Sequence, residues 1–333
     1  MKKKITINDI AKLAGVSKTT VSFYLNGKYD KMSEETKARI GSVIEKTDYQ
    51  PNTLARSLNS KQTHLIGVII GDITNSFANQ VIKGINDYCQ QQGYQMIVGS
   101  SGYELEHERK YVRSMGAMGA DGFIVQPTVY FETMWRESGN DKPIAYFDSP
   151  NQASQDLWVK TNNFEAVYNA VEELTERGYD QYVMITADPY VLNTRMERYK
   201  GFTECLDERR LPYSVITADV NTTPAELKKQ LDPVLNEKKH TCVFVCNNWL
   251  LDKAYLVIRD YKKLIPDHIG LIGFDSLEWS ELASPSITTI VQPAYEEGQT
   301  AARILIDRIE GKNNEAPNWI LQCRINELES TRR

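Results

Sequence analysis

Hydrophobic residues from position 64 onward fall in short runs that alternate with longer amphipathic stretches. The runs are rich in β-branched and aromatic residues and are bounded by turn-forming residues, which is typical of buried strands. Two of the stretches between them, residues 77–92 and 164–177, are long enough for crossover helices. The expected strands occupy residues 65–70, 95–99, 122–126, 143–147, 181–186, 213–217, 241–246 and 269–274.

This alternation predicts an α/β body whose parallel sheets are buried on both faces. About 270 residues with this many strands suit two doubly wound subdomains better than one. Ligands of such sheets bind beyond the carboxyl ends of the strands, so functional side chains are expected in the loops that follow them.

The residues before this body lack strand-like alternation, and turn signals separate short helical patterns there. Asn and Ser stand where helices are expected to begin, and Gly or Asn stands where they end. The three predicted helices begin after Asn8, Ser17 and Ser33 and end near residues 14, 25 and 46. Residues 52–58, which follow Pro51, are expected to form one further short helix.

The first two of these helices have the residue spacing of a helix-turn-helix that begins at Ile7. Ala11 falls where the two helices cross, Gly15 falls in the turn, and Val21 packs the second helix onto the first. An αα-hairpin that binds nothing is the alternative explanation of this spacing. If the second helix enters the major groove of DNA, the side chains that face the groove are Lys18, Thr19, Ser22 and Phe23.

Charge separates the two parts of the chain. The net charge is −5, yet residues 1–61 hold 12 Lys or Arg against 6 Asp or Glu, and the remaining residues hold 27 against 38. A basic head on an acidic body indicates that the head, and not the body, meets a polyanion. Together with the helix-turn-helix spacing, this balance favours DNA as the partner of the head.

The sequence also resembles the LacI/GalR family of repressors along its whole length. The head and hinge carry the resemblance in Val16-Ser-Lys-Thr-Thr-Val-Ser, Leu25-Asn-Gly, Ser33-Glu-Glu-Thr and Tyr49-Gln-Pro-Asn-Thr-Leu-Ala-Arg-Ser-Leu. The body carries it in Leu65-Ile-Gly-Val-Ile, Arg198-Tyr-Lys-Gly-Phe, Leu271-Ile-Gly-Phe-Asp and Thr288-Thr-Ile-Val-Gln-Pro.

The resemblance implies an all-α helix-turn-helix head over residues 1–50, a hinge helix and linker over 51–62, and a two-lobed core over 63–333. The core is similar to periplasmic sugar-binding proteins. A homodimer is implied, whose two heads bind a pseudo-palindromic operator in double-stranded DNA. By this resemblance the DNA contacts come from Thr6, Ile7, Ser17, Lys18, Thr19, Thr20, Ser22, Phe23, Asn26, Asn52, Ala55, Arg56 and Leu58.

Two of these residues affect how DNA is recognised. Phe23 departs from the family, many of whose members have Arg there, and Phe cannot bond bidentately to guanine. Phe23 is expected to contact a thymine methyl group or to pack inward. Leu58 matches the leucine that such repressors insert into the central minor groove, which bends the DNA. An ordinary apolar residue on a linker helix is the alternative reading of Leu58.

Polar and aromatic residues near the strand ends of the body suggest a binding site for a small molecule. Asp72, Asp148, Asn248 and Asp275 follow expected strands, and Arg198 lies on the helix after residue 186. An Asp in such a loop is also a common turn former or helix cap. Flat walls for a sugar ring are expected from Phe77, Trp158 and Trp249, although Trp158 also fits an interface or the core.

Other classes of protein fit this sequence less well. The enzyme alternative lacks a G-x-G-x-x-G loop after a strand, a P-loop and a G-x-S-x-G motif, so no cofactor is expected. The cysteines and histidines have no metal spacing, and no apolar run is long enough for a membrane span. Five scattered cysteines and no signal-like start favour reduced thiols in the cytosol. An exported binding protein would need a signal and no DNA-binding head.

The sequence therefore predicts a DNA-binding transcriptional regulator, a repressor of genes for carbohydrate uptake or catabolism. A sugar or sugar acid is the expected effector, bound between the two lobes. Its binding is expected to change the orientation of the lobes and, through the hinge, the affinity for the operator. The alternative is a sugar-binding module or an α/β enzyme without any link to DNA.

Overall fold

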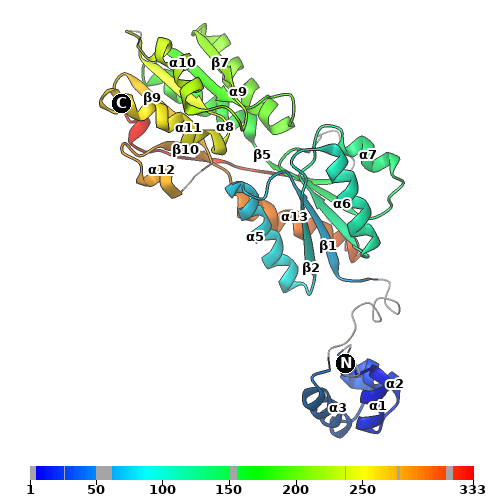
Figure 1. Ribbon diagram of the computed structural model, residues 1–333. Coiled ribbons are helices and arrows are strands. Elements are labelled where there is room, and N and C mark those ends of the chain that lie inside the picture. The colour runs from blue at the N-terminus through cyan, green and yellow to red at the C-terminus, as the bar shows by residue number, and fades with distance from the viewer. Residues whose placement is uncertain are drawn as a thin grey trace. The chain divides into compact units, whose positions relative to one another are not determined.

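A computed structural model describes residues 5–25, 27–49, 62–150, 156–236, 238–275, 278–312 and 318–333. The chain forms two compact units, Met1–Thr63 and His64–Arg333. The first unit contains the helical head and the second is the α/β body (Figure 1).

Helices make up nearly all of the described part of the head. They are α1 Ile7–Ala14, α2 Lys18–Leu25, the 3-10 helix η1 Tyr29–Lys31 and α3 Glu34–Thr47. Ile10, Ala11 and Val21 are buried against one another and form the small core of the head. Gly15 adopts a φ of 62°, which lets the chain turn between α1 and α2 without the strain that a side chain would add. The expected helix-turn-helix packing is therefore present.

The head helices begin at capping residues, one of which differs from the prediction. Ser17 caps α2 and Ser33 caps α3, as expected, because each Oγ accepts the backbone N–H three residues on, at 3.1 and 3.2 Å. The cap of α1 is Thr6 and not Asn8. Thr6 and Asp9 form a reciprocal capping box, in which Asp9 Oδ2 accepts the Thr6 N–H at 2.9 Å. Asn8 is a good capping residue by type, but it lies inside the helix.

The body consists of two lobes, each built on a six-stranded sheet (Figure 1). The first sheet contains β1 Leu65–Ile70, β2 Gln95–Ser100, β3 Gly122–Val125, β4 Ile144–Phe147, β5 Leu157–Thr161 and β11 Asn318–Leu321. The second sheet contains β6 Gln181–Thr186, β7 Tyr213–Thr217, β8 Thr241–Val245, β9 Ile269–Phe274, β10 Thr288–Val291 and β12 Arg324–Asn326.

The order of the strands is that of a doubly wound fold. The first lobe has the order β11-β5-β4-β3-β1-β2, and the second has β12-β10-β9-β8-β6-β7. All neighbouring strands pair in parallel except β12, which is antiparallel to β10. The prediction of two doubly wound, mainly parallel sheets is confirmed.

Helices cover the sheets of both lobes. The helices of the first lobe are α5 Ser76–Gln91, α6 Leu105–Ala117, α7 Phe131–Glu137 and α13 Ala294–Ile309. Those of the second lobe are α8 Asn163–Glu176, α9 Asn193–Arg209, α10 Pro224–Leu235, α11 Asn248–Ile258, η2 Arg259–Leu264, α12 Glu278–Leu282 and η3 Glu329–Thr331. Gly84 of α5 and Gly298 of α13 let these two helices touch, because a Cβ on Gly298 would lie 2.1 Å from the Val81 carbonyl oxygen.

Four strands, β5, β10, β11 and β12, were not predicted from the apolar runs. In β5 the charged Lys160 interrupts the apolar pattern, but the structure buries this side chain to 3% exposure. Lys160 Nζ forms an ion pair with Glu197 of α9, which offsets the cost of burying the ammonium group. The other three strands have only three or four residues each and, unlike the equally short β3 and β4, each contains polar residues that interrupt an apolar run.

The chain passes between the lobes three times, from β5 to α8, from β10 to α13 and from β11 to β12 (Figure 1). Hydrogen bonds join these three crossover segments. Thr161 Oγ1 donates to Gln292 Oε1 at 2.7 Å, which joins the first segment to the second. Asn162 Oδ1 accepts the N–H of Cys323 at 2.8 Å, which joins the first segment to the third. The two lobes are therefore joined by three crossover segments that are hydrogen-bonded to one another.

Candidate DNA-binding surface and effector cleft

The surface of α2 holds the side chains that the sequence assigns to the major groove. Lys18 and Thr19 are exposed, and Ser22 and Phe23 are half-buried. Val21 is fully buried and fixes the rotation of the helix. An ammonium group suits phosphates, and hydroxyl groups suit phosphates or base edges, so this face has the chemistry of a recognition helix.

The other candidates for DNA contact lie at the start of α1, within α2 or outside the described residues. Thr6 caps α1, the half-buried Ile7 begins it, and Thr20 Oγ1 lies 2.9 Å from Ser17 Oγ at the start of α2. The residues that lie outside the described part of the chain are Asn26, Asn52, Ala55, Arg56 and Leu58. The expected hinge helix over residues 52–58 lies outside it as well.

A cleft between the two lobes of the body brings together most of the expected effector residues. Asp148 follows β4 in the first lobe, and Asp275 follows β9 in the second. Arg198 reaches the cleft from α9. The predicted residues that line it are Phe77, Asp148, Arg198, Asn248, Trp249 and Asp275. The carboxyl ends of two parallel sheets thus meet at one site, as the topology predicts.

Direct hydrogen bonds between the lobes keep this cleft closed. Asn248 Nδ2 of the second lobe donates to Asn75 Oδ1 of the first lobe at 2.9 Å and to Ser76 Oγ at 3.2 Å. On another side of the cleft, Ser149 Oγ lies 2.8 Å from Thr194 Oγ1. The cavity that remains inside the cleft has a volume of about 30 Å³. A sugar-sized ligand enters only if the lobes move apart.

The guanidinium group of Arg198 is held firmly by its own lobe. Arg198 Nε donates to Asn163 Oδ1 at 2.7 Å, and Nη1 donates to the carbonyl oxygen of Cys246 at 3.1 Å. The Phe274 ring lies beneath the group, with 3.6 Å between Cζ and the ring centroid. These contacts fix the plane of the guanidinium, which prepares it for directional recognition of a ligand.

The two cleft aspartates occupy equivalent positions in the two lobes. Asp148 accepts a hydrogen bond from Gln126 Nε2 at 2.6 Å, and Asp275 accepts one from Gln292 Nε2 at 2.8 Å. Both have a left-handed backbone, with φ of 60° and 69°, which Asp tolerates better than most residues. Burial raises the pKa of Asp148 above its ordinary value and raises the pKa of Asp275 to about 6.

A third carboxyl group, Glu297 of α13, lies fully buried beneath the cleft. Glu297 Oε1 accepts the backbone N–H of Asp148 at 2.7 Å. Burial raises the pKa of Glu297 well above its ordinary value, and the neighbouring Asp148 raises it further. Through this hydrogen bond Glu297 positions the backbone of Asp148 from beneath the cleft.

A chain of hydrogen bonds links Arg198 and Asp275 of the cleft to the crossover segments between the lobes. Arg198 donates to Asn163 Oδ1, and Asn163 Nδ2 donates to Thr161 Oγ1 at 3.0 Å. Thr161 in turn donates to Gln292, whose amide nitrogen donates to Asp275. Thr161 and Gln292 belong to two of the three crossover segments. Arg198 and Asp275 are thus connected to each other by hydrogen bonds that run through the crossover segments.

Two expected effector residues do not line the cleft. Asp72 follows β1, but its Oδ1 accepts hydrogen bonds from the N–H and hydroxyl of Thr74 at 2.8 and 2.7 Å, so it forms a turn. Trp158 packs into the hydrophobic core of the first lobe with Phe131 and Tyr146, and it is only 8% exposed. Because successive side chains of β5 point to opposite faces of the sheet, its register decides this placement. Of the alternatives considered for Trp158, the structure places this residue in the core.

The cleft contains further residues that the sequence analysis did not identify. Arg195 lies one turn before Arg198 on α9, and Tyr103 lies near the end of β2. An i, i+3 spacing on one helix face was the available signal for Arg195. The lining residues that were missed are Asn75, Tyr103, Gln126, Leu192, Thr194, Arg195, Asn247 and Gln292.

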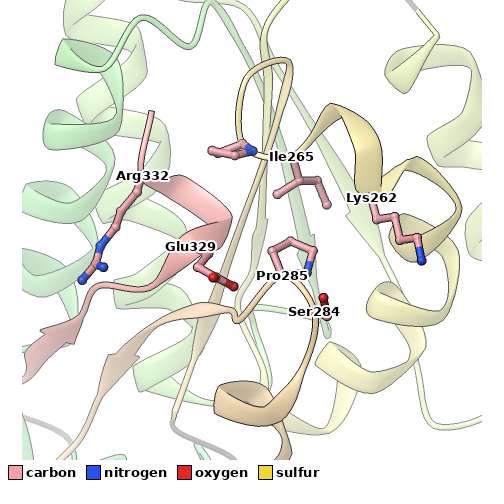
Figure 2. Close-up of a pocket in the computed structure, with 7 residues that line it drawn as sticks. Lys262, Ile265, Ser284, Pro285, Glu329 and Arg332 are labelled. Carbon is pink, nitrogen blue, oxygen red and sulfur yellow. The ribbon is translucent and has the colours of Figure 1, made fainter.

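A second, open pocket lies on the surface of the second lobe (Figure 2). Pro285, Ile265 and the side chains of Lys262, Glu329 and Arg332 line it. The Glu329 carboxylate already accepts hydrogen bonds from the N–H and hydroxyl of Ser286 at 2.9 and 3.1 Å. This pocket is a solvent-facing depression, and its acidic group is occupied by structural hydrogen bonds.

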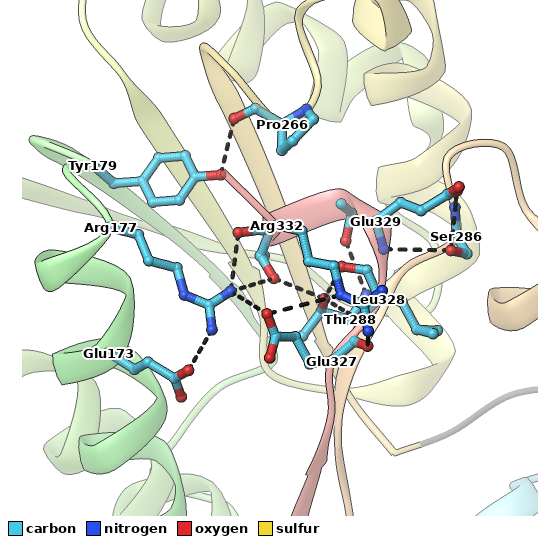
Figure 3. A network of polar contacts seen from close by, with 12 residues as sticks. Glu173, Arg177, Tyr179, Pro266, Ser286, Thr288, Glu327, Leu328, Glu329 and Arg332 are labelled. Atoms are coloured by element: carbon cyan, nitrogen blue, oxygen red, sulfur yellow. Dashed lines mark hydrogen bonds and ion pairs between the residues drawn. The ribbon is translucent and has the colours of Figure 1, made fainter.

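The polar network beside this pocket anchors the last residues of the chain (Figure 3). Arg177, the residue that follows α8, pairs with Glu173 and with Glu327, the latter at 2.9 Å. Its Nη1 also donates to the carbonyl oxygen of Thr331 at 3.0 Å. Tyr179 donates its hydroxyl to the carbonyl oxygen of Pro266 at 3.0 Å. These contacts are structural, since they hold the end of the chain against the second lobe.

The described residues contain no cluster of three His, Cys, Asp or Glu side chains that is placed to hold a metal ion. No helix among the described residues is long and apolar enough to cross a membrane. All five cysteines are free thiols, and Cys242 and Cys246 lie in the core. Burial raises the pKa of Cys205 to about 11, so this thiol is protonated at neutral pH.

Comparisons with known proteins agree with this architecture. The family of bacterial regulatory proteins called the lacI family matches residues 6–52, and a periplasmic binding protein-like domain matches residues 171–331. A probable HTH-type transcriptional regulator, EndR of Paenibacillus polymyxa, is 33% identical over 317 residues, which cover 93% of this chain and 92% of that protein.

Solved structures show the same fold. The lac repressor dimer bound to operator and the anti-inducer ONPF superposes with a TM-score of 0.85 at 22% identity, covering 99% of each chain. A LacI family transcriptional regulator from Enterococcus faecium with bound ribose has a TM-score of 0.68 at 26% identity, covering 80% of this chain and 98% of that one. With its helix-turn-helix head and two-lobed body, the chain belongs to the lacI family of bacterial regulatory proteins and is a DNA-binding transcriptional regulator.

Proposed function

We propose that this regulator is a homodimeric repressor of genes for carbohydrate uptake or catabolism, controlled by a sugar or sugar acid. The observation that carries the proposal is the cleft, where Asp148 of the first lobe faces Arg198, Asn248 and Asp275 of the second lobe. Hydroxyl-rich ligands need such fixed donors and charged acceptors. The half-buried Trp249 and the buried Phe77 supply flat surfaces for a sugar ring.

The head supports the DNA-binding half of the proposal. Its basic excess favours attraction to phosphates, and Lys18 and Thr19 stand exposed on α2. A dimer would present two such helices to a pseudo-palindromic operator, as the two-fold symmetry of such complexes requires. The lac repressor structure that shares this fold is a dimer bound to operator, which favours the same assembly here. Because its target is DNA, we place the protein in the cytosol.

The closed cleft supports the carbohydrate half. A family member with 26% identity holds ribose, so this fold accommodates a sugar. An effector that enters the cleft must displace or replace the bonds from Asn248 to Asn75 and Ser76. Effector binding therefore selects a different orientation of the lobes. The expected hinge helix and linker, residues 51–62, come shortly before β1 in the chain. We therefore propose that a change of lobe orientation in a dimer alters the formation of the hinge helix and, with it, the affinity for the operator.

An enzymatic role is the weaker alternative. The cleft carboxylates Asp148 and Asp275 both accept hydrogen bonds from glutamine amides, and the nearest thiol, Cys246, is buried and protonated because burial raises its pKa. These groups hold fixed positions and none is activated as a nucleophile. We infer that the protein binds its carbohydrate without converting it.

The proposal is tested with the full-length chain, operator DNA and a carbohydrate library. Fluorescence anisotropy measures operator affinity, and thermal shift measures effector binding, because a ligand of the native state raises the melting temperature. We expect at least one sugar or sugar acid to raise the melting temperature and to change operator affinity.

Two variants separate the sites. Arg198→Ala should retain operator affinity in the absence of effector and lose the thermal shift. Lys18→Ala should retain the thermal shift and lose operator affinity. Turnover of the bound carbohydrate, or a thermal shift without any change in operator affinity, would contradict the proposal.

A further inference from the structure

The cleft contains one buried cation, Arg195, whose guanidinium forms no hydrogen bond or ion pair with another described residue. Arg195 of α9 is 9% exposed and lines the cleft one helical turn from Arg198. Among the described residues, no hydrogen-bond acceptor is bonded to its guanidinium and no carboxylate oxygen lies within 4.0 Å of it. The five N–H donors of this group are therefore left for something outside the described residues.

The other buried cations of the described chain are all satisfied. Lys160 is paired with Glu197, and Arg198 donates to Asn163 and to a backbone carbonyl oxygen. A guanidinium that is largely buried and forms no hydrogen bond with a described residue has lost part of its hydration without replacement, which is unfavourable. Burial accordingly lowers the pKa of Arg195 below its ordinary value. Such an arrangement is expected where a ligand supplies the missing partner.

Neighbouring side chains do not supply this partner. The Tyr103 ring centroid lies 5.5 Å from Arg195 Cζ, and burial raises the pKa of Tyr103 to about 12, so its phenol is neutral. Asp148 attracts Arg195 through space, but its carboxylate is bonded to Gln126 and to no guanidinium nitrogen. Glu297 lies beneath the cleft, and its Oε1 accepts the backbone N–H of Asp148. The guanidinium of Arg195 therefore forms no hydrogen bond with a described residue, whereas the carboxylates of Asp148 and Asp275 each accept one.

We propose that the effector of this cleft carries an oxyanion, a carboxylate or a phosphate on a carbohydrate, and that Arg195 binds that group. The inference rests on the proposed function, since it names the chemical class of the same effector. A guanidinium forms two parallel hydrogen bonds to a planar carboxylate or to a phosphate, a geometry that neutral hydroxyl groups do not reproduce. Arg198 then serves the carbohydrate hydroxyls beside it.

The experiment compares anionic carbohydrates with neutral ones of the same carbon skeleton. Thermal shift of the full-length chain is measured at pH 7.5 and equal ionic strength with D-gluconate against sorbitol, D-glucuronate against glucose, and D-galacturonate against galactose. Glucose 6-phosphate and ribose 5-phosphate against glucose and ribose form the phosphate arm. We expect a larger shift from an anionic member than from its neutral partner, and the arm in which it occurs identifies the oxyanion.

Variants of Arg195 link that preference to the residue. Arg195→Gln should weaken binding of the anionic ligand by about 10-fold to 100-fold, since charged hydrogen bonds are lost. The ligand-free variant should melt at a higher temperature than the wild type, because an unpaired buried charge is gone. Arg195→Lys should bind with intermediate affinity, because it keeps the charge but not the fork. Arg210→Gln is the matched control, since Arg210 is exposed at the end of the same helix.

The possible results separate the two proposals. A neutral carbohydrate that binds, alters operator affinity and is indifferent to Arg195→Gln would overturn the assignment of Arg195 and leave the proposed function intact. An anionic ligand whose affinity Arg195→Gln leaves unchanged would also overturn it. Absence of binding and of operator response across a full library of neutral and anionic carbohydrates would refute the carbohydrate effector itself, and the inference with it.

Discussion

Removing the charge of Asp275 should stabilise the protein while weakening its response to effector. Asp275 is 8% exposed, and burial raises the pKa of its carboxyl group to about 6, against an ordinary value of 3.8. The nearby Arg198 and the hydrogen bond from Gln292 lower this pKa and offset part of the effect, while Asp148 raises it. Asp275→Asn retains an oxygen that accepts the Gln292 hydrogen bond and removes the buried charge.

The sign and size of the effect follow from proton linkage. The unfolded carboxyl ionises near pH 3.8 and the folded one near pH 6. Stability from this group is therefore greatest at low pH, falls as the pH rises between these values, and is constant above them. The difference corresponds to about 3 kcal/mol at pH 7 and to about 1 kcal/mol at pH 4.5. For a body of this size, these free energies amount to about 6 °C and 2 °C in melting temperature.

The assay compares melting temperatures of the wild type and Asp275→Asn from pH 4.5 to pH 8 at one protein concentration. The advantage of the variant should grow up to about pH 6 and then level off. Asp72→Asn is the control, because Asp72 is partly exposed and an amide oxygen accepts the same bonds from Thr74. Effector affinity of Asp275→Asn should fall by about 10-fold or more, since a charged acceptor of hydroxyl groups is lost.

Two results would refute this reasoning. If Asp275→Asn is less stable than the wild type at pH 7, then Arg198 compensates the carboxylate fully and burial is not the dominant effect. If the variant is more stable by the same amount at every pH, the gain comes from packing and not from ionisation. Either result would also change the view of the cleft as a site that sacrifices stability for binding.

Three further predictions concern other parts of the chain. Glu297→Gln should leave the melting temperature within about 2 °C of the wild type near pH 6, because the amide oxygen still accepts the Asp148 N–H, whereas Glu297→Ala should lower it measurably by leaving that N–H unbonded. Val21→Ala should destabilise the head by on the order of 2 kcal/mol and weaken operator binding, measured by anisotropy, with no change in effector affinity. Leu58→Ala should leave the body folded and reduce operator affinity by on the order of 1–3 kcal/mol, with a smaller DNA bend in a gel-shift assay.

The strand pattern of the body was predictable because buried parallel strands leave long apolar runs. Residues 65–70 and 181–186 are strands with the expected bounds. Strand β5 was not predicted because Lys160 interrupts its apolar pattern. No pattern in a single strand reveals that the distant Glu197 pairs with this charge. The role of Trp158 stayed open between ligand wall and core for a related reason: without the bounds of β5, the face that its side chain occupies was undetermined.

The cleft was predictable only where a residue follows a strand directly. Asp148 and Asp275 occupy such positions, and the topology alone brings both to one site. Arg195 was not predictable in this way, because its role depends on the rotation of α9 and on the absence of an acceptor within reach among the described residues. A position directly after a strand is not sufficient, however, because Asp72 occupies such a position and forms a local turn outside the cleft.

If the effector binds in the cleft as proposed, the hydrogen-bond chain through the crossover segments links its recognition to the orientation of the lobes. A ligand that bonds to Arg198 or Asp275 competes with, or strengthens, their bonds to Asn163 and Gln292. Those two residues share Thr161 between them, so a shift at either end changes the geometry of two crossover segments at once. Because the segments are short and already bonded, they favour a few discrete arrangements over a continuous range. A ligand that binds one of these arrangements more tightly than the others therefore shifts the lobes toward it, and regulation by an effector requires such a shift.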